Sequence, residues 1–339
     1  MKIHLVFVKY AVIVLVIFAS GCTQRYNDKS DTFVSNKISL NSDKYRVLVW
    51  LNDHELALIG PSHSADPVSA KRFESPYVLD IHTGALTGMR PPAPNRICTK
   101  LWSIDVYDHQ SLAIEPDCNL RKDHINERQP AIYILRNPQG EAELLCELDP
   151  KRAPVESRFN PTNPNEWVHV EAITYSLSNR MVLYNGCNPV RTIEPAFFDI
   201  VRPQWSPAGK MIAFTGLAND PGLAETNPKW KGQLFAVRAL FAYDVSTETT
   251  THLVSGFDSL QAVGWSDDSS YLYFIGEYAR GINGLWRLSL TSKEVELLWR
   301  GEARNGAVSP DHRSFAMLVK RKINGENLTE IEIVSDQKK

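Results

Sequence analysis

From residue 44 onwards the chain is built from short stretches in which apolar and polar residues alternate, separated by groups of Gly, Pro, Asn, Asp and Ser. Alternation with a period of two predicts β-strands that bury one face, and the residues between them favour tight turns. No long stretch places its apolar residues at helical spacing. The pattern therefore predicts an all-β protein.

A repeated unit organises these strands. Each copy has an aromatic residue or Val, a turn rich in Ser, Pro, Asp or Gly, and a strand whose apolar residue lies seven positions after the first. The clear copies are Trp205–Phe214, Trp265–Phe274, Val308–Met317 and Tyr175–Tyr184, and the weaker ones are Asp105–Ile114 and Trp50–Ile59. Pro fixes φ and Gly accepts positive φ, so each unit predicts an antiparallel hairpin.

Second hairpins follow several of these units, at Tyr77–Leu86, Ile132–Leu144, Phe241–Thr250 and Leu285–Leu297. Two hairpins form a four-stranded blade, and blades repeated around an axis form a β-propeller. The Trp-Ser-Pro-x-Gly-Lys-x-Ile-Ala-Phe unit at Trp205–Phe214 resembles the repeats of the TolB-type propeller, which also occur in the propeller domains of prolyl oligopeptidases. The resemblance covers roughly residues 44–337 and implies six blades of about 49 residues. Seven blades stay an alternative, because Tyr175 and Trp205 lie unusually close.

The N-terminus predicts an exported, lipid-anchored protein. An apolar run at residues 10–19 is preceded by Lys2 and Lys9 and followed by Ser20, Gly21 and Cys22. This layout is typical of a secretory signal and resembles a bacterial lipobox, which implies cleavage before a lipidated Cys22. We therefore expect a signal peptide at residues 1–21, a flexible lipidated tether at 22–43 and the propeller at 44–337.

The residue at position 23, directly after the lipidated cysteine, predicts in which membrane the protein is anchored. Thr23 stands there instead of Asp. By the sorting rule of enterobacteria-like envelopes, this implies the inner leaflet of the outer membrane, with the protein facing the periplasm. The inner membrane is the alternative.

Charge and motifs exclude several functions. The chain carries 37 Lys and Arg against 39 Asp and Glu, a net charge of −2, which predicts no nucleic-acid partner. Gly264-Trp-Ser266 begins like a hydrolase nucleophile elbow but lacks the final Gly, and His54-Glu55 begins like a zinc motif but Leu58 replaces the second His. We expect no catalytic residue, no metal site and no cofactor.

Four cysteines besides Cys22 predict disulfides in an oxidising periplasm. In a hairpin with its turn at residues 107–110, paired positions have a constant sum, and 98 + 118 equals 106 + 110. This register places Cys98 opposite Cys118, as a disulfide requires. By elimination, Cys146 would pair with Cys187.

Long connections indicate where the propeller binds. In each blade, tight turns join the first strand to the second and the third strand to the fourth. The long connections are at 60–76, 118–130, 149–167 and 216–233. We assign the first, second and fourth of these to connections between second and third strands, and 149–167 to a connection between blades. All four then share one face, and long loops on a rigid scaffold usually carry binding.

The longest of these loops contains Lys229, Trp230 and Lys231, a candidate binding group because Trp is favoured at interfaces. We therefore expect a membrane-anchored binding or scaffolding module with an envelope protein partner or ligand. The alternative is a propeller enzyme that acts on envelope glycans or peptides. The oligomeric state stays open.

Overall fold

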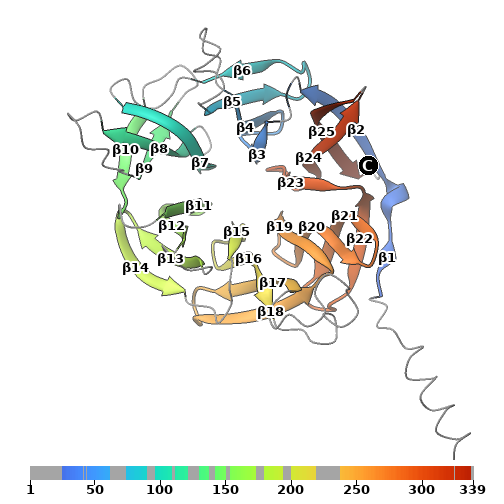
Figure 1. Cartoon of the computed structure of the whole chain (residues 1–339). Helices are drawn as coiled ribbons and strands as arrows, with labels where there is room; N and C mark the ends of the chain where they lie inside the picture. The colour runs from blue at the N-terminus through green and yellow to red at the C-terminus, as the bar shows by residue number, and fades with distance from the viewer. Residues whose placement is uncertain are drawn as a thin grey trace, which may run out of the picture.

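The computed structural model describes residues 25–40, 42, 44–61, 74–89, 96–108, 111–120, 130–136, 142–149, 153–172, 179–193, 200–218, 237–323 and 325–336. These residues form six antiparallel sheets arranged as blades around a central channel (Figure 1). The fold is a six-bladed β-propeller, as the repeats predicted, and the seven-blade alternative is wrong.

The first three blades each follow the chain from the channel outwards. Blade 1 contains β3 (Arg46–Trp50), β4 (Glu55–Pro61), β5 (Glu74–Asp80) and β6 (Leu86–Gly88). Blade 2 contains β7 (Arg96–Asp108), β8 (Ser111–Leu120), β9 (Ala131–Leu135) and β10 (Ala142–Glu147). Blade 3 contains β11 (Ala153–Asn160), β12 (Asn163–Ala172), β13 (Asn179–Asn185) and β14 (Asn188–Ile193).

The other three blades complete the ring. Blade 4 contains β15 (Val201–Trp205), β16 (Met211–Ala218), β17 (Val237–Asp244) and β18 (Thr249–Ser255). Blade 5 contains β19 (Asp258–Trp265), β20 (Tyr271–Ala279), β21 (Ile282–Ser289) and β22 (Val295–Arg300), with β1 (Asn27–Asp28) parallel to β22 at its outer edge. Blade 6 contains β23 (Ala303–Val308), β24 (Ser314–Ile323) and β25 (Glu326–Asp336), and its outermost strand is β2 (Phe33–Leu40).

The core of the described chain is divided into six apolar clusters, one between each pair of neighbouring blades. Aromatic residues at the ends of the inner strands join the blades. Trp205 Nε1 donates a hydrogen bond to the Arg158 carbonyl of blade 3 at 3.0 Å, and Trp265 Nε1 donates to the Gln204 carbonyl of blade 4 at 3.0 Å. Both indoles are almost fully buried, so their predicted role in blade packing is confirmed.

The N-terminal boundary differs from the sequence prediction. Residues 33–40 were assigned to the tether, but they form β2 and pair antiparallel with β25 over the whole strand. A short 3-10 helix, η1 (Ser30–Thr32), precedes β2. Pairing of β2 satisfies the outer edge of blade 6 and joins the two ends of the propeller chain, which explains why this polar segment is ordered.

The assignment of blade 3 also needs correction. The segment 149–167 is not a connection between blades, because it contains β11 and the turn to β12. Tyr175 falls between β12 and β13, outside the described residues, so Met181 begins the buried part of a third strand and not of a second strand. The long connections 62–73, 121–130 and 219–236 do join second to third strands, so the prediction that these three share one face is confirmed.

No helix in the described part of the chain is both long and apolar enough to cross a membrane.

Candidate binding site in the central channel

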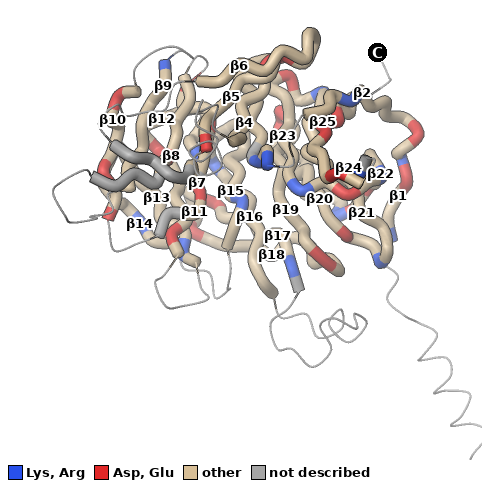
Figure 2. Tube along the Cα trace, turned by 45° about the horizontal axis from the view of Figure 1, so that its top comes forward, with Lys and Arg blue, Asp and Glu red and all other residues tan. Residues whose placement is uncertain are grey.

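Charged side chains from neighbouring inner strands meet at one end of the channel. Arg46 is the first residue of β3 and Arg202 the second of β15. Inner strands begin on the face of the ring where second strands connect to third strands, because strands alternate in direction within a blade. Figure 2 shows acidic and basic positions distributed around the ring. Arg46 and Arg202 therefore lie towards the channel end that carries the long connections, and Arg158 and Asp105 lie deeper along their strands.

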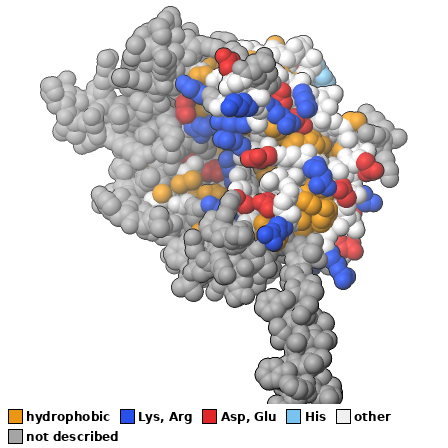
Figure 3. Space-filling model, turned by 45° about the vertical axis from the view of Figure 1, so that its right-hand side comes forward, with side chains coloured by type: hydrophobic (Ala, Val, Ile, Leu, Met, Phe, Trp, Pro, Cys, Tyr) orange, Lys and Arg blue, Asp and Glu red, His pale blue; other side chains and the backbone are white. Residues whose placement is uncertain are grey.

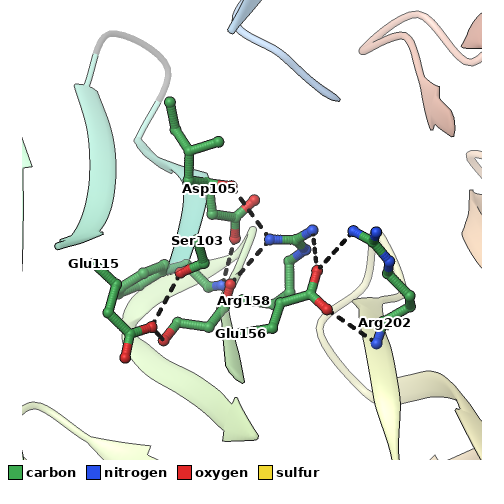
Figure 4. A network of polar contacts seen from close by, with 9 residues as sticks. Ser103, Asp105, Glu115, Glu156, Arg158 and Arg202 are labelled. Carbon is green, nitrogen blue, oxygen red and sulfur yellow. Dashed lines mark hydrogen bonds and ion pairs between the residues drawn. The ribbon is translucent and has the colours of Figure 1, made fainter. Parts of the chain in front are cut away.

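Glu156 and Arg158 of β11 form the centre of this cluster with Arg202 of β15 (Figure 4). Arg158 Nη2 lies 2.5 Å from Glu156 Oε1, and both side chains are more than nine-tenths buried. Arg202 Nη1 lies 3.6 Å from the same oxygen, while the Arg202 backbone N–H donates to Glu156 Oε2 at 3.0 Å. One carboxylate is thus shared between two guanidinium groups.

The backbone at Arg202 is unusual. Its φ is +58°, in the left-handed region that residues other than Gly, Asn and Asp rarely adopt. The pairing of β15 with β16 shifts register between Val201 and Gln204, so Arg202 lies in a bulge. Bulges redirect side chains and are frequent beside functional sites. Here the bulge presents the Arg202 backbone N–H to Glu156.

Asp105 of β7 faces the same group. Its Oδ2 accepts a hydrogen bond from the Phe159 backbone N–H at 2.8 Å. Burial raises the pKa of Asp105 from 3.8 to about 6, although the positive charge of Arg158 acts in the opposite direction. The carboxyl group is only partly exposed to solvent. A carboxyl group with a perturbed pKa beside paired charges is typical of functional sites.

Arg46 extends the cluster towards blade 2. Its Nη2 lies 2.6 Å from Glu74 Oε2 and also donates to the Leu101 carbonyl, while Leu101 N–H donates to the same carboxylate oxygen at 3.0 Å. Burial lowers the pKa of the Arg202 guanidinium, and the nearby charges of Arg158 and Arg46 lower it further against the opposing effect of Glu156. The three arginines are therefore close enough to interact electrostatically.

A buried polar layer supports the inner strands between blades 2 and 3. Ser103 and Ser157 both donate to Glu115 Oε2, at 3.1 and 2.9 Å, and Ser157 Oγ lies 2.9 Å from His169 Nδ1. All four side chains are at most 3% exposed. These residue types can form a hydrolytic triad, but no substrate can reach the Ser157 hydroxyl at this exposure. The layer therefore positions β7 and β11.

Comparison with solved structures identifies proteins with the same architecture. TolB from Acinetobacter baumannii is matched with a TM-score of 0.55 at 11% identity, over 84% of this chain and 64% of that chain. An oligogalacturonate lyase in complex with manganese is matched with a TM-score of 0.53 at 10% identity, over 90% of this chain and 91% of that one. The fold is shared with both. At 10–11% identity, the comparison shows the fold alone.

A second oligogalacturonate lyase, from Vibrio parahaemolyticus, is matched with a TM-score of 0.52 at 12% identity, over 85% of this chain and 76% of that chain. The chain spans less than two thirds of the TolB chain that it matches. No protein-family model and no curated protein sequence matches the chain. The resemblance to TolB-type propellers is therefore confirmed at the level of the fold.

Two of the residue groups predicted from the sequence lie outside the described residues: Cys22, and the loop residues Lys229, Trp230 and Lys231. Lipidation and loop binding stay predictions. Within the described part of the chain, no group of three or more His, Cys, Asp or Glu side chains is placed to hold a metal ion.

The cysteines give a mixed result. Cys98 and Cys118 are opposite each other in the pairing of β7 with β8, although three register shifts intervene and Val106 pairs with Leu112 instead of residue 110. Their side chains are outside the described set, so their disulfide stays a prediction. Cys146 and Cys187 are free thiols in the structure. Burial raises the pKa of the Cys146 thiol, and a hydrogen bond with Cys187 raises it further. The two thiols are therefore neighbours.

Sequence reasoning missed the charged residues of the channel. A signal was present in Val155-Glu156-Ser157-Arg158, where polar residues interrupt a segment that the structure shows to be an inner strand. The pattern instead favours a connection over 149–167, so it does not predict these charges to line the channel.

Proposed function

We propose that this protein is a lipid-anchored binding module of the bacterial envelope. Cys22 attaches it to the inner leaflet of the outer membrane, and the propeller faces the periplasm. An envelope protein or a ligand binds at the channel end surrounded by the long connections. The observation that carries the proposal is the charged group of Arg46, Asp105, Glu156, Arg158 and Arg202, contributed by four inner strands.

This group favours binding over a purely structural role. Removing charges from water costs several kcal/mol per ion, and hydrophobic replacements of a buried ion pair are often neutral or stabilising. A propeller does not need charges at this position to close, because its apolar clusters already join every pair of neighbouring blades. Arg46 and Arg202 keep a third and a quarter of their side chains exposed and are available to a ligand.

Capture of partners from solubilised envelopes, with the full-length protein as bait, tests the binding face. Shortening the connection 219–236 should weaken capture. The control is Asp267→Lys, which changes an exposed residue in the tight turn between β19 and β20, on the opposite face. If Asp267→Lys abolishes capture and the shortened connection does not, the proposed face is wrong.

Fractionation of membranes tests the anchor. Wild-type protein should co-sediment with outer membranes, whereas Cys22→Ser should lose the cleavage site and the lipid and leave the outer-membrane fraction. Recovery of wild-type protein in the inner membrane alone would contradict the proposed location.

The second candidate function is an enzyme that acts on envelope glycans, favoured by the match to oligogalacturonate lyase over nearly the full length of both chains. That lyase was solved with manganese. Among the described residues here, no group of three or more His, Cys, Asp or Glu side chains is placed to hold a metal ion. Cleavage of oligogalacturonate by the purified protein, lost on Asp105→Asn, would favour the enzyme over the binding module.

A further inference from the structure

Of the three described arginines in the cluster, Arg202 has the weakest side-chain pairing. A guanidinium has five N–H donors. Its contact among the described residues is the ion pair with Glu156 Oε1 at 3.6 Å, which is longer than a hydrogen bond. One quarter of the side chain is exposed. The partly exposed guanidinium of Arg202 therefore keeps N–H donors that a ligand could use.

The charges nearby favour an anion in that space. Arg158 and Arg202 share the single carboxylate of Glu156, while Arg46 is matched by Glu74. Asp105 is the remaining carboxylate, and burial gives it a pKa of about 6. When Asp105 is protonated, three arginines face two carboxylates. An oxyanion would restore neutrality and accept charge-assisted hydrogen bonds.

The backbone provides an independent observation. Arg202 is held in the left-handed region directly before Pro203, although residues before proline are usually extended. Strained backbone of this kind costs on the order of 1–3 kcal/mol and concentrates at sites that bind or react. The strain is retained at a residue whose guanidinium has its ion-pair partner at 3.6 Å, beyond hydrogen-bond distance.

We infer that the channel end between β3, β11 and β15 binds an oxyanion, a carboxylate or a phosphate group of the ligand, through the guanidinium of Arg202 assisted by Arg158 and Arg46. Arg202 supplies the direct contact because it is the most weakly paired of the three. Arg158 is fixed by Glu156 and by the carbonyls of Ile104 and Ser157, so it contributes mainly charge. The inference rests on the proposed binding function and names the ligand chemistry of the same channel end.

Glu156 has a defined part in this arrangement. Its carboxylate already occupies part of the space between Arg158 and Arg202, and it therefore competes with an external anion. Glu156→Gln removes the competing charge while the amide oxygen can still accept from the Arg202 backbone N–H. Anion affinity should consequently rise in this variant, whereas a purely structural ion pair predicts no gain.

The test is titration of the full-length protein with sodium acetate and, separately, with inorganic phosphate at about pH 5.5, below the pKa of Asp105, against sodium chloride of equal ionic strength. The readout is the NMR signal of the arginine Nε–Hε groups. We expect saturable shifts with at least one oxyanion and weaker, non-saturable shifts with chloride. Preference for acetate would indicate a carboxylate ligand, and preference for phosphate a phosphorylated one.

Variants make the test specific. Arg202→Gln should weaken oxyanion binding about tenfold or more, the effect expected for a lost charge-assisted hydrogen bond, and Arg202→Lys should be intermediate because it lacks the planar fork. Arg280→Gln is the matched control: it removes the same charge from an exposed residue between β20 and β21, on the same face but in blade 5. It should bind like wild type.

Two results would overturn the inference: equal shifts with chloride and both oxyanions, or unchanged binding in Arg202→Gln. If the wild-type protein binds an oxyanion but captures no partner, only the proposed partner function is contradicted. The two failures can therefore be told apart.

Discussion

Trp205 shows how one residue connects packing with the channel. Its indole lies in the apolar cluster between blades 3 and 4, while its N–H binds the carbonyl of Arg158, next to the shared carboxylate of Glu156. The residue that joins two blades therefore also fixes the strand that carries the charges. Packing and binding are coupled at this position.

Trp205→Phe should destabilise the protein by about 1–3 kcal/mol, because a buried carbonyl loses its donor while most of the aromatic packing stays. Urea unfolding measures the change. Trp286→Phe, which removes a buried indole hydrogen bond to the Gly276 carbonyl within blade 5, is the control away from the arginines. It should cost about as much stability but leave oxyanion binding unchanged. An equal loss of binding in both variants would show that the coupling is not specific to Trp205.

Asp105 should make stability depend on pH in a defined direction. Its pKa rises from 3.8 to about 6 on folding because of burial. The stabilising contribution of the protonated group is complete below pH 4 and is lost as the pH rises through 6. Asp105→Asn should therefore lose less stability than wild type between pH 4 and pH 7, by on the order of 1–3 kcal/mol. Chemical unfolding at both pH values measures the difference.

Asp80→Asn is the control with the opposite sign. Hydrogen bonds from the backbone of Thr83 and then His82 lower the pKa of Asp80, against a small opposing effect of burial. Its contribution is present at neutral pH and is lost progressively as the pH falls below 3.8, so this variant should lose stability at pH 7 relative to wild type and progressively less in acid. The same direction of change in both variants would contradict the assignment.

At the scale of elements, the turns between first and second strands are built alike. In blades 4, 5 and 6 a serine hydroxyl accepts the N–H that opens the second strand: Ser206 from Met211 at 3.0 Å, Ser266 from Tyr271 at 2.9 Å and Ser309 from Ser314 at 2.9 Å. The serine that recurs in the sequence unit thus has a structural reason in each case.

Gly209 in the first of these turns should tolerate no side chain. Its φ is +65°, and a Cβ there would lie 2.3 Å from Asn160 Oδ1 and 2.5 Å from Thr162 Oγ1 in blade 3. Gly84 has a similar φ of +70° but no atom within 4 Å of a Cβ. Gly84→Ala should cost about 1 kcal/mol, and Gly209→Ala clearly more. Thermal unfolding of both variants separates the cost of the backbone conformation from the cost of the clash. Equal losses of stability would mean that Asn160 and Thr162 move aside at little cost.

The sequence predicted these elements where the repeat is regular and failed where it is not. The spacing from Trp205 to Ile212 also holds for Trp265 and Leu272, and both pairs are strand partners. In blade 3 the partner of Phe159 is Trp167, eight positions on. That single extra residue hid the hairpin and led Tyr175 to be taken for a first strand.

The channel site could not have been predicted for a related reason. Arg46, Asp105, Glu156 and Arg202 are far apart in the chain, and only the closed ring brings them together. Their charges looked like those of solvated strand faces. Register errors had a smaller effect: Cys98 lies opposite Cys118 in the strand pairing although the sum of positions changes along the hairpin, and their disulfide stays a prediction.

At the scale of the whole molecule, β2 closes the ring. It pairs with β25 from Phe33 opposite Asp336 to Leu40 opposite Thr329, so the start and the end of the propeller share one blade. Figure 3, which brings this side of the ring forward, shows acidic and basic side chains interspersed with apolar ones.

Removing residues 25–40 should lower the melting temperature strongly and broaden the transition, because the outer edge of β25 loses its partner and Leu40 leaves the cluster between blades 6 and 1. Differential scanning calorimetry measures both effects. A variant with scrambled residues 25–32 and intact β2 is the control and should keep a sharp transition. Unchanged melting in the truncated protein would show that blade 6 is complete with three strands.

The docking of β1 changes how far the propeller can move from a membrane. Tyr26 packs edge-on against Trp286 at 5.1 Å, Asp28 pairs with Arg300 at 2.8 Å, and the Lys29 N–H binds the Leu297 carbonyl at 2.7 Å. With the lipid on Cys22, as proposed, only about 14 Å of free chain separates it from Tyr26, whereas a tether reaching residue 43 would span about 70 Å. The anchor is then a short tether that joins the propeller at the outer edge of blade 5. The ring would stand on its edge at the lipid surface, with both mouths of its channel open to the periplasm.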